Sequence, residues 1–123
     1  MTSDAHFFDT YAIIETIKAN ENYLPYISST PVLTQLNLFE LYYTLLREFN
    51  SEIASTFLLK YSPFAIDFDN KTIEEAAQFR LKYKKNHLSM TDCVGYISAC
   101  RLGVPFLTGD KEFSNFPNVA FVK

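Results

Sequence analysis

Short apolar segments alternate with longer amphipathic segments along this chain. Five runs are apolar almost throughout and have the length of buried strands, at residues 6–8, 31–33, 64–68, 104–107 and 119–122. Between them, apolar residues recur at helical spacing over about residues 11–18, 35–49, 51–60, 72–84 and 90–102. Strands without a polar side are typical of parallel sheets that helices cover on both faces. The pattern therefore predicts an α/β fold, a three-layer sandwich with a small, mainly parallel sheet.

Local signals predict where several helices begin and end. Ser51 stands at the start of one helical segment as a candidate N-cap, and Ser89 with Asp92 has the spacing of a capping box. Gly103 is expected to end the helix that Ser89 opens. The segment 35–49 carries apolar residues on nearly all sides, so we expect that helix to be largely buried.

Length and composition are those of a single domain over residues 1–123. The chain is 48% hydrophobic, with 12 Phe and 8 Tyr, and is long enough to build a sizeable core. Its first residues lack the basic start and long apolar core of a secretory signal, and no apolar run has the length of a membrane span. Cys93 and Cys100 lie on one predicted helix, where they cannot bridge. We therefore expect a cytoplasmic protein without a membrane partner.

Four acidic residues stand where a parallel sheet would bring them together. Asp9 follows the first strand, Asp110 follows the fourth, and Asp92 lies in the first turn of the helix before the fourth strand. Glu40 falls among apolar residues of a helix, where an unpaired carboxylate is costly. Right-handed crossovers put the ends of the first and fourth strands at one edge of the sheet, where α/β folds bind ligands.

Each of these acids also has an ordinary structural explanation. Asp9 can cap the helix that follows it, and Asp92 can belong to the capping box with Ser89. Glu40 can pair with a basic residue elsewhere or face a solvent-filled groove. The joint pattern is harder to explain in this way, because converging carboxylates repel one another and raise their own pKa values unless a cation lies between them.

The residue types favour a particular cation and chemistry. Oxygen ligands suit Mg²⁺ or Mn²⁺ rather than Zn²⁺, and neither His6 nor His87 is spaced to join a metal site. Such a site supports hydrolytic phosphoryl transfer by a metal-activated water and needs no side-chain nucleophile. The chain carries no Gly-rich phosphate loop, and no Ser or Cys is placed with a His as in a nucleophile–base pair.

The order of these motifs resembles the PIN domain family, and the chain length is similar to that of its VapC-type toxins. The resemblance rests on four segments: Phe8-Asp9-Thr10, Asn37-Leu38-Phe39-Glu40-Leu41, Asp92 opening a helix, and Leu107-Thr108-Gly109-Asp110-Lys111-Glu112-Phe113. One departure is Tyr11, because the family usually has Asn two residues after the first Asp. This change puts the polar surroundings of Asp9 in question.

The resemblance implies a metal-dependent endoribonuclease, the toxin of a toxin–antitoxin pair. It implies Mg²⁺ or Mn²⁺ bound by Asp9, Asp92 and Asp110, with Glu40 binding the metal or orienting the attacking water. Thr10 and Thr108 would be polar residues that support these ligands. The expected partners are an RNA substrate, a second copy of the chain in a homodimer, and a cognate antitoxin whose tail occupies the active groove.

The distribution of positive charge bears on the RNA partner. The net charge of −3 argues against a protein whose main task is non-specific nucleic-acid binding. Basic residues nevertheless gather at the end of one predicted helix, at Arg80, Lys82, Lys84 and Lys85. They are candidate RNA contacts, because phosphate binding needs local positive charge, but cations also stabilise a helix C-terminus.

Two other functions fit the sequence less completely. A non-catalytic member of the same fold, binding a protein or RNA without cleaving it, is favoured by Tyr11 alone. A phosphotransfer receiver is also a small α/β domain with an acidic pocket. The receiver is the weaker candidate because it needs paired acids near the first strand and a central phospho-accepting Asp, and the acids here are spaced otherwise.

Overall fold

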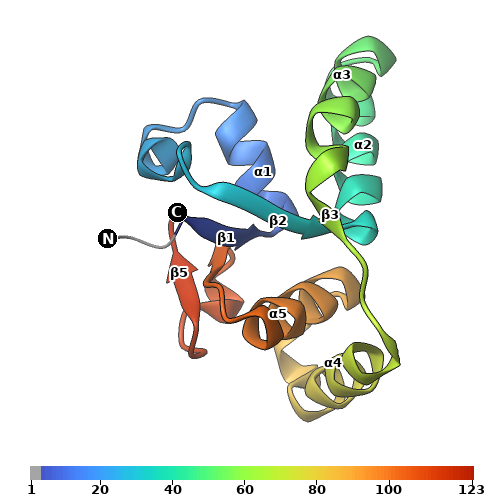
Figure 1. The fold of residues 1–123 in the computed structure, drawn as a ribbon, viewed down its shortest axis with the longest axis vertical. Helices are drawn as coiled ribbons and strands as arrows, with labels where there is room; N and C mark the ends of the chain where they lie inside the picture. Colours follow the sequence, from blue (N-terminus) through green and yellow to red (C-terminus); the bar gives the residue numbers. More distant parts are fainter. Residues whose placement is uncertain (1–3) are drawn as a thin grey trace.

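The computed structural model describes residues 4–123 and contains a five-stranded parallel sheet between two helical layers (Figure 1). The strands are β1 (Ala5–Phe8), β2 (Thr30–Thr34), β3 (Ala65–Ile66), β4 (Phe106–Thr108) and β5 (Val119–Phe121). Their order in the sheet is β3-β2-β1-β4-β5, and each neighbouring pair is parallel. Phe8 of β1 lies opposite Leu107 of β4, so the carboxyl ends of these strands are adjacent. The predicted three-layer α/β sandwich is confirmed.

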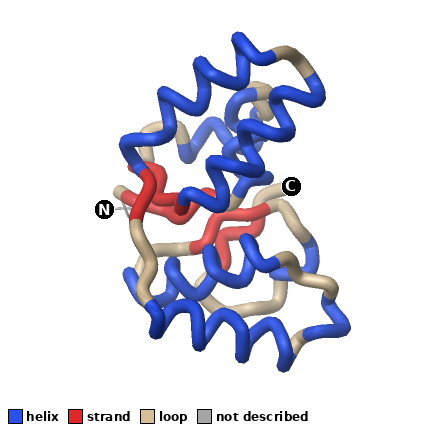
Figure 2. The backbone as a smooth tube through the Cα atoms, turned by 90° about the vertical axis from the view of Figure 1, so that its right-hand side faces the viewer, coloured by secondary structure: helices blue, strands red, loops and turns tan. Residues whose placement is uncertain are grey.

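Helices cover both faces of the sheet (Figures 1 and 2). One layer consists of α1 (Thr10–Ile17), α2 (Gln35–Glu48) and α3 (Ser51–Tyr61), and the other of α4 (Asn70–Lys82) and α5 (Met90–Leu102). Short 3₁₀ helices in the connections are η1 (Glu21–Tyr26), η2 (Ser62–Phe64), η3 (Lys84–Asn86) and η4 (Lys111–Phe113). Within residues 4–123, no helix is both long and apolar enough to span a membrane.

Neighbouring residues of the central strands enter separate cores because side chains alternate across a sheet. Phe7 and Phe106 pack with α4 and α5, and their rings stack with centroids 5.7 Å apart. Phe8 and Leu107 pack on the opposite face with α1, α2 and α3. A one-residue slip between β1 and β4 would move these large side chains to the wrong core. The two cores therefore fix the register on which the positions of the following acidic residues depend.

Helix ends follow the predicted signals with one correction. Ser89 caps α5 by accepting a hydrogen bond from the Asp92 backbone N–H at 3.0 Å, and Gly103 ends this helix with φ of +73°. The prediction that Ser51 caps α3 is wrong, because Asn50 occupies that position and its Oδ1 accepts from the Ile53 N–H at 2.8 Å. Ser51 is instead the first helical residue. Both residue types are good caps, so composition alone did not separate them.

The prediction that α2 is largely buried is also wrong. Its inner face contains Leu41 and Leu45, which are almost fully buried, whereas Phe39 and Tyr43 are 74% and 54% exposed. The helix packs on the sheet, α1 and α3 along one side only, and nothing within residues 4–123 covers the other. Phe39, Tyr43 and Leu46, which were among the residues that suggested a largely buried helix, form an exposed stripe on α2.

Candidate metal site

Asp9, Glu40, Asp92 and Asp110 line one cleft with a volume of about 470 Å³. Asp9 follows β1 and Asp110 follows β4, the strands whose carboxyl ends are adjacent. Glu40 enters the cleft from α2 and Asp92 from the first turn of α5. The structure thus places together all four acids that the sequence singled out, although their chemical roles stay predictions.

Asp9 is fixed at both carboxylate oxygens. As the N-cap of α1, it accepts a hydrogen bond at Oδ1 from the Ala12 backbone N–H at 2.8 Å. Its Oδ2 accepts a short hydrogen bond from the Thr108 hydroxyl. The residue is only 2% exposed. The Asp9 side chain therefore caps α1 and also lines the cleft.

Thr108 links Asp9 to Asp110. While its hydroxyl donates to Asp9, the same oxygen accepts a hydrogen bond from the Asp110 backbone N–H at 3.0 Å. Asp110 is the N-cap of η4, and its Oδ1 accepts from the Glu112 N–H at 3.0 Å. Thr108 is fully buried, so solvent does not compete for these bonds. Thr108 therefore lies beside the acids, and its role as a support of metal ligands stays a prediction.

Glu40 is oriented by a chain of polar side chains. The Thr10 hydroxyl donates to Glu40 Oε1 at 2.7 Å and accepts from Asn37 Nδ2 at 3.2 Å. Asn37 is held in turn, because its Oδ1 accepts from both the backbone N–H and the hydroxyl of Thr34, at 3.0 and 2.9 Å. Sequence reasoning assigned no role to Asn37. Its spacing of three residues from the cap Thr34 was the available signal, since such pairs form capping boxes.

Two acids of the cleft have pKa values above the ordinary value of an aspartate. Burial raises the pKa of Asp9 to about 8, and the charges of Asp92 and Asp110 act in the same direction, against the hydrogen bonds from Thr108 and Ala12. Burial likewise raises the pKa of Asp92 to about 6, and the neighbouring Glu40 and Asp110 charges add to the shift. A divalent cation in the cleft would remove the cause of both shifts.

The donor set fits Mg²⁺ or Mn²⁺ by type, because carboxylates and hydroxyls are the ligands that these ions prefer. Within residues 4–123, however, no group of three or more Asp, Glu, His or Cys side chains is arranged ready to coordinate an ion. The residues therefore fit a metal by charge and chemistry, and binding would require the carboxylates to close around it.

Residues 6–119 match the family model of the PIN domain. The chain belongs to the PIN domain family. The match spans most of the chain and includes all four acidic residues of the cleft. No curated protein sequence matches it.

Solved structures with the same fold include toxin–antitoxin complexes. A "Toxin-antitoxin complex from Klebsiella pneumoniae" aligns with a TM-score of 0.73 and 18% identity over 94% of this chain and 96% of the other. A DNA-bound VapBC from Salmonella typhimurium aligns with a TM-score of 0.70 and 19% identity, covering 95% and 96%. VapBC2 from Rickettsia felis, bound to a promoter DNA fragment, aligns with a TM-score of 0.74 and 18% identity over 97% of this chain and 99% of the other. At these identities the likeness is one of fold.

The basic residues of this PIN domain do not act as one group. Arg80 and Lys84 line a cleft with Ser89, which also borders the acidic cleft. Arg80 is held there by a hydrogen bond from its Nε to the Leu88 carbonyl at 3.1 Å. Lys82 lines a different cleft between α4 and α5, and Lys85 is exposed and lines neither. Of these four basic residues, only Arg80 and Lys84 line a cleft that meets the acidic one.

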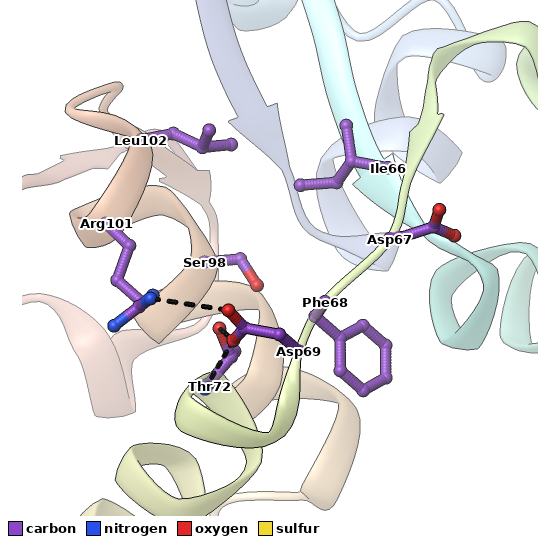
Figure 3. A pocket seen from close by; sticks show the side chains of 8 residues that line it. All are labelled: Ile66, Asp67, Phe68, Asp69, Thr72, Ser98, Arg101 and Leu102. Carbon is purple, nitrogen blue, oxygen red and sulfur yellow. Dashed lines mark hydrogen bonds and ion pairs between the residues drawn. The ribbon is translucent and has the colours of Figure 1, made fainter.

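A further cleft of about 280 Å³ lies between the segment after β3 and the end of α5 (Figure 3). Its basic residue is already paired: Arg101 lies 3.7 Å from Asp69 and 3.2 Å from Glu75. Asp69 caps α4, and hydrogen bonds from Thr72 lower its pKa. Asp69 is exposed and paired with Arg101, whereas Asp9 is buried with a raised pKa, which is why the acidic cleft is the candidate active site of the PIN domain.

Proposed function

We propose that this PIN domain is a metal-dependent endoribonuclease that cleaves RNA by hydrolysis. The convergence of Asp9, Glu40, Asp92 and Asp110 in one cleft carries the proposal, because two of these acids have raised pKa values that a cation would relieve. Asp9, Asp92 and Asp110 would hold Mg²⁺ or Mn²⁺. The bound ion would supply a polarised phosphate and a water of lowered pKa.

The chain's own residues account for the remaining requirements of hydrolysis. Thr10 occupies Glu40 Oε1, which leaves Oε2 free to orient a water and accept its proton. Thr108 fixes Oδ2 of Asp9 and positions the backbone of Asp110, so these ligands keep their places as substrate binds. The residues that line the cleft include no Cys or His, and the Ser89 hydroxyl already accepts a hydrogen bond as a helix cap.

The substrate proposal rests on positive charge next to the acids. Arg80 and Lys84 lie in the cleft that meets the acidic one at Ser89, where they can bind phosphates on one side of the scissile bond. Lys82 and Lys85 are further from the acids and would add to the general attraction of RNA. RNA is preferred over a small phosphate ester because these cations extend beyond the acidic cleft.

We infer that the protein is the toxin of a toxin–antitoxin pair, acting in the cytoplasm as a homodimer restrained by its antitoxin. The similar folds of complexes named as toxin–antitoxin and VapBC assemblies support this inference. The exposed stripe on α2, with Phe39, Tyr43 and Leu46, gives a protein partner an apolar surface to cover. Co-expression with the product of a neighbouring small reading frame, followed by co-purification and loss of nuclease activity, tests the pairing.

The nuclease proposal is tested by cleavage of single-stranded RNA in Mn²⁺ and in EDTA. Wild-type protein should cleave only with metal, and Asp9→Asn and Asp92→Asn should each lower the rate by at least about a hundredfold, since each removes a ligand charge. Asp69→Asn is the matched control, because Asp69 is also an N-cap aspartate but lies outside the cleft. Equal rates in all four proteins would rule out this active site.

A non-catalytic RNA- or protein-binding module is the second candidate. It is favoured by the lack of a ready-made coordinating group within residues 4–123 and by Tyr11, whose ring fills part of the cleft wall. Calorimetric titration with Mn²⁺ separates the two functions. A nuclease should bind Mn²⁺ more weakly after Glu40→Gln, whereas a module without catalysis should show no binding that depends on Glu40.

A further inference from the structure

Lys123 brings a positive charge into the acidic cleft from the chain segment after β5. Its side chain lines the cleft with the acids, and Nζ donates to the Gly109 carbonyl at 3.4 Å. The ammonium also lies 5.9 Å from the centre of the Tyr11 ring. The cation is thus held on the wall of the cleft by a carbonyl and an aromatic ring.

The backbone before this side chain is tied down at several points. The Val122 N–H donates to the Thr108 carbonyl at 2.8 Å, and the Tyr23 hydroxyl donates to the Val122 carbonyl. Asn22 Nδ2 donates to the carbonyl of Lys123 itself at 3.1 Å. These bonds connect the segment both to β4 and to the turn after α1. The position of Lys123 is therefore built into the fold, rather than being that of a loose tail.

Gly109 makes this arrangement sterically feasible. A Cβ atom added to Gly109 would lie 2.1 Å from Tyr11 Cε1 and 2.7 Å from the Val122 carbonyl oxygen, which are distances that atoms cannot adopt. Only glycine therefore lets the Tyr11 ring and the Val122 backbone meet at this place. The ring then lies beneath the Lys123 ammonium, next to Asp9 and Asp110 in the cleft.

The Lys123 ammonium forms no ion pair with a carboxylate of residues 4–123. Across residues 4–123, the ion pairs involve Lys18, Arg47 and Arg101, and none involves Lys123. An ammonium group has three N–H donors, and the Gly109 carbonyl takes one of them. Two donors and the full positive charge remain for a ligand. A cation that only balanced the acids would be expected to pair with one of them.

We propose that Lys123 binds a phosphate of the RNA strand that lies across the acidic cleft. The inference rests on the proposed nuclease function, and it defines a second border of the RNA site. Arg80 and Lys84 would bind the strand beyond Ser89, and Lys123 would bind it beside Gly109 and Asp110. The strand between these cations then passes over the four acids, where a scissile phosphate must lie.

The test measures binding of a fluorescent single-stranded RNA by anisotropy, in Ca²⁺ instead of Mn²⁺ so that the probe is recovered intact. Lys123→Gln should weaken binding roughly tenfold, and the slope of log K against log salt should fall by about 0.7, the value for one phosphate contact on a single strand. Lys123→Arg should retain most of the affinity. The control Lys71→Gln makes the same charge change at an exposed residue in the first turn of α4, outside the cleft.

Each outcome decides the proposal. Equal affinity and equal salt slope for Lys123→Gln and Lys71→Gln would overturn it, as would a wild-type protein that does not bind RNA at all. Weaker binding with an unchanged salt slope, or no rescue by Lys123→Arg, would show a structural role and also overturn it. If wild type binds RNA through Lys123 but does not cleave it in Mn²⁺, the nuclease proposal fails while the phosphate contact stands.

Discussion

Asp9→Asn should stabilise the metal-free protein while abolishing its proposed activity. Burial raises the pKa of Asp9 in the folded state to about 8 from an ordinary value of 3.8. Between these two pH values the folded state retains a proton that the unfolded state has released, so the free energy of unfolding falls as pH rises. Asn carries no titrating proton and keeps the cap of α1, because Asn and Asp are equally good N-caps.

The size of the effect follows from the pKa difference. Each pKa unit corresponds to 1.36 kcal/mol, so the cost of Asp9 to the folded state at pH 7 has an upper bound of about 4 kcal/mol. Part of the gain is lost because an Asn amide places a donor where Oδ2 accepted from Thr108. We expect a net stabilisation of about 2 kcal/mol at pH 7, larger at pH 8 and smaller at pH 5.

The assay is urea unfolding in EDTA at pH 5, 7 and 8, repeated with Mn²⁺. Asp69→Asn is again the control, because hydrogen bonds from Thr72 lower the pKa of that exposed cap and its loss should not stabilise. Added Mn²⁺ should stabilise wild type, through binding to the folded state alone, and should have little effect on Asp9→Asn. A stability difference between Asp9→Asn and wild type that stays constant from pH 5 to pH 8 would refute the account of Asp9 as a buried, raised-pKa carboxylate.

Two further substitutions probe the walls of the cleft. Gly109→Ala should destabilise the protein by roughly 1–3 kcal/mol in thermal or urea unfolding, because its Cβ would overlap Tyr11. A free energy of unfolding equal to that of wild type would contradict this packing. Thr10→Val should lower kcat for RNA cleavage about tenfold, because Glu40 loses the bond that orients it, and should also lower Tm, because the buried Asn37 amide loses its acceptor. Thr16→Val is its control on the same helix. Equal effects of the two substitutions on kcat would show that Thr10 has no role in the active site.

The sequence predicted the sheet and the acidic cleft because both depend on short-range patterns. Apolar runs and helical periodicity gave the order of strands and helices, and parallel pairing then required Asp9 and Asp110 to emerge at one edge. The cleft was predictable because each acid lies within or next to a helix or strand that the sequence pattern identifies. Family resemblance added the expected roles of these acids, which the proposed experiments test.

The exposure of individual residues on a helix was not predictable from the sequence, because it depends on how much of the helix surface its neighbours bury. Periodicity shows which residues of α2 share a face, but it does not show how much of the helix its neighbours cover, and so Phe39 was expected inside and lies 74% exposed. The arrangement of the basic residues in space was unpredictable for a related reason. Residues two positions apart on a helix point in different directions, which places Arg80 beside the acids and Lys82 in another cleft.

Polar supports of the site were missed where their partners are distant in sequence. Asn37 reads as one polar residue in an apolar helix, and its function becomes visible only when Thr10 lies 3.2 Å from its amide. Lys123 similarly needs Gly109 and Tyr11 to have a position at all. A burial pattern can show that a polar residue needs partners, but not which partners the fold supplies.

Burial has opposite effects on stability at two neighbouring residues, one in the core and one in the cleft. Phe8 stabilises the fold by being buried, and Asp9, the next residue, opposes it for the same reason, since burial raises the pKa of its carboxyl. Asp9 is retained at a position where Asn would cap α1 equally well and would not titrate. A residue that destabilises the fold, and that another residue could replace as a helix cap, is expected to have a chemical role. This is the physical reason for proposing that Asp9 binds the metal.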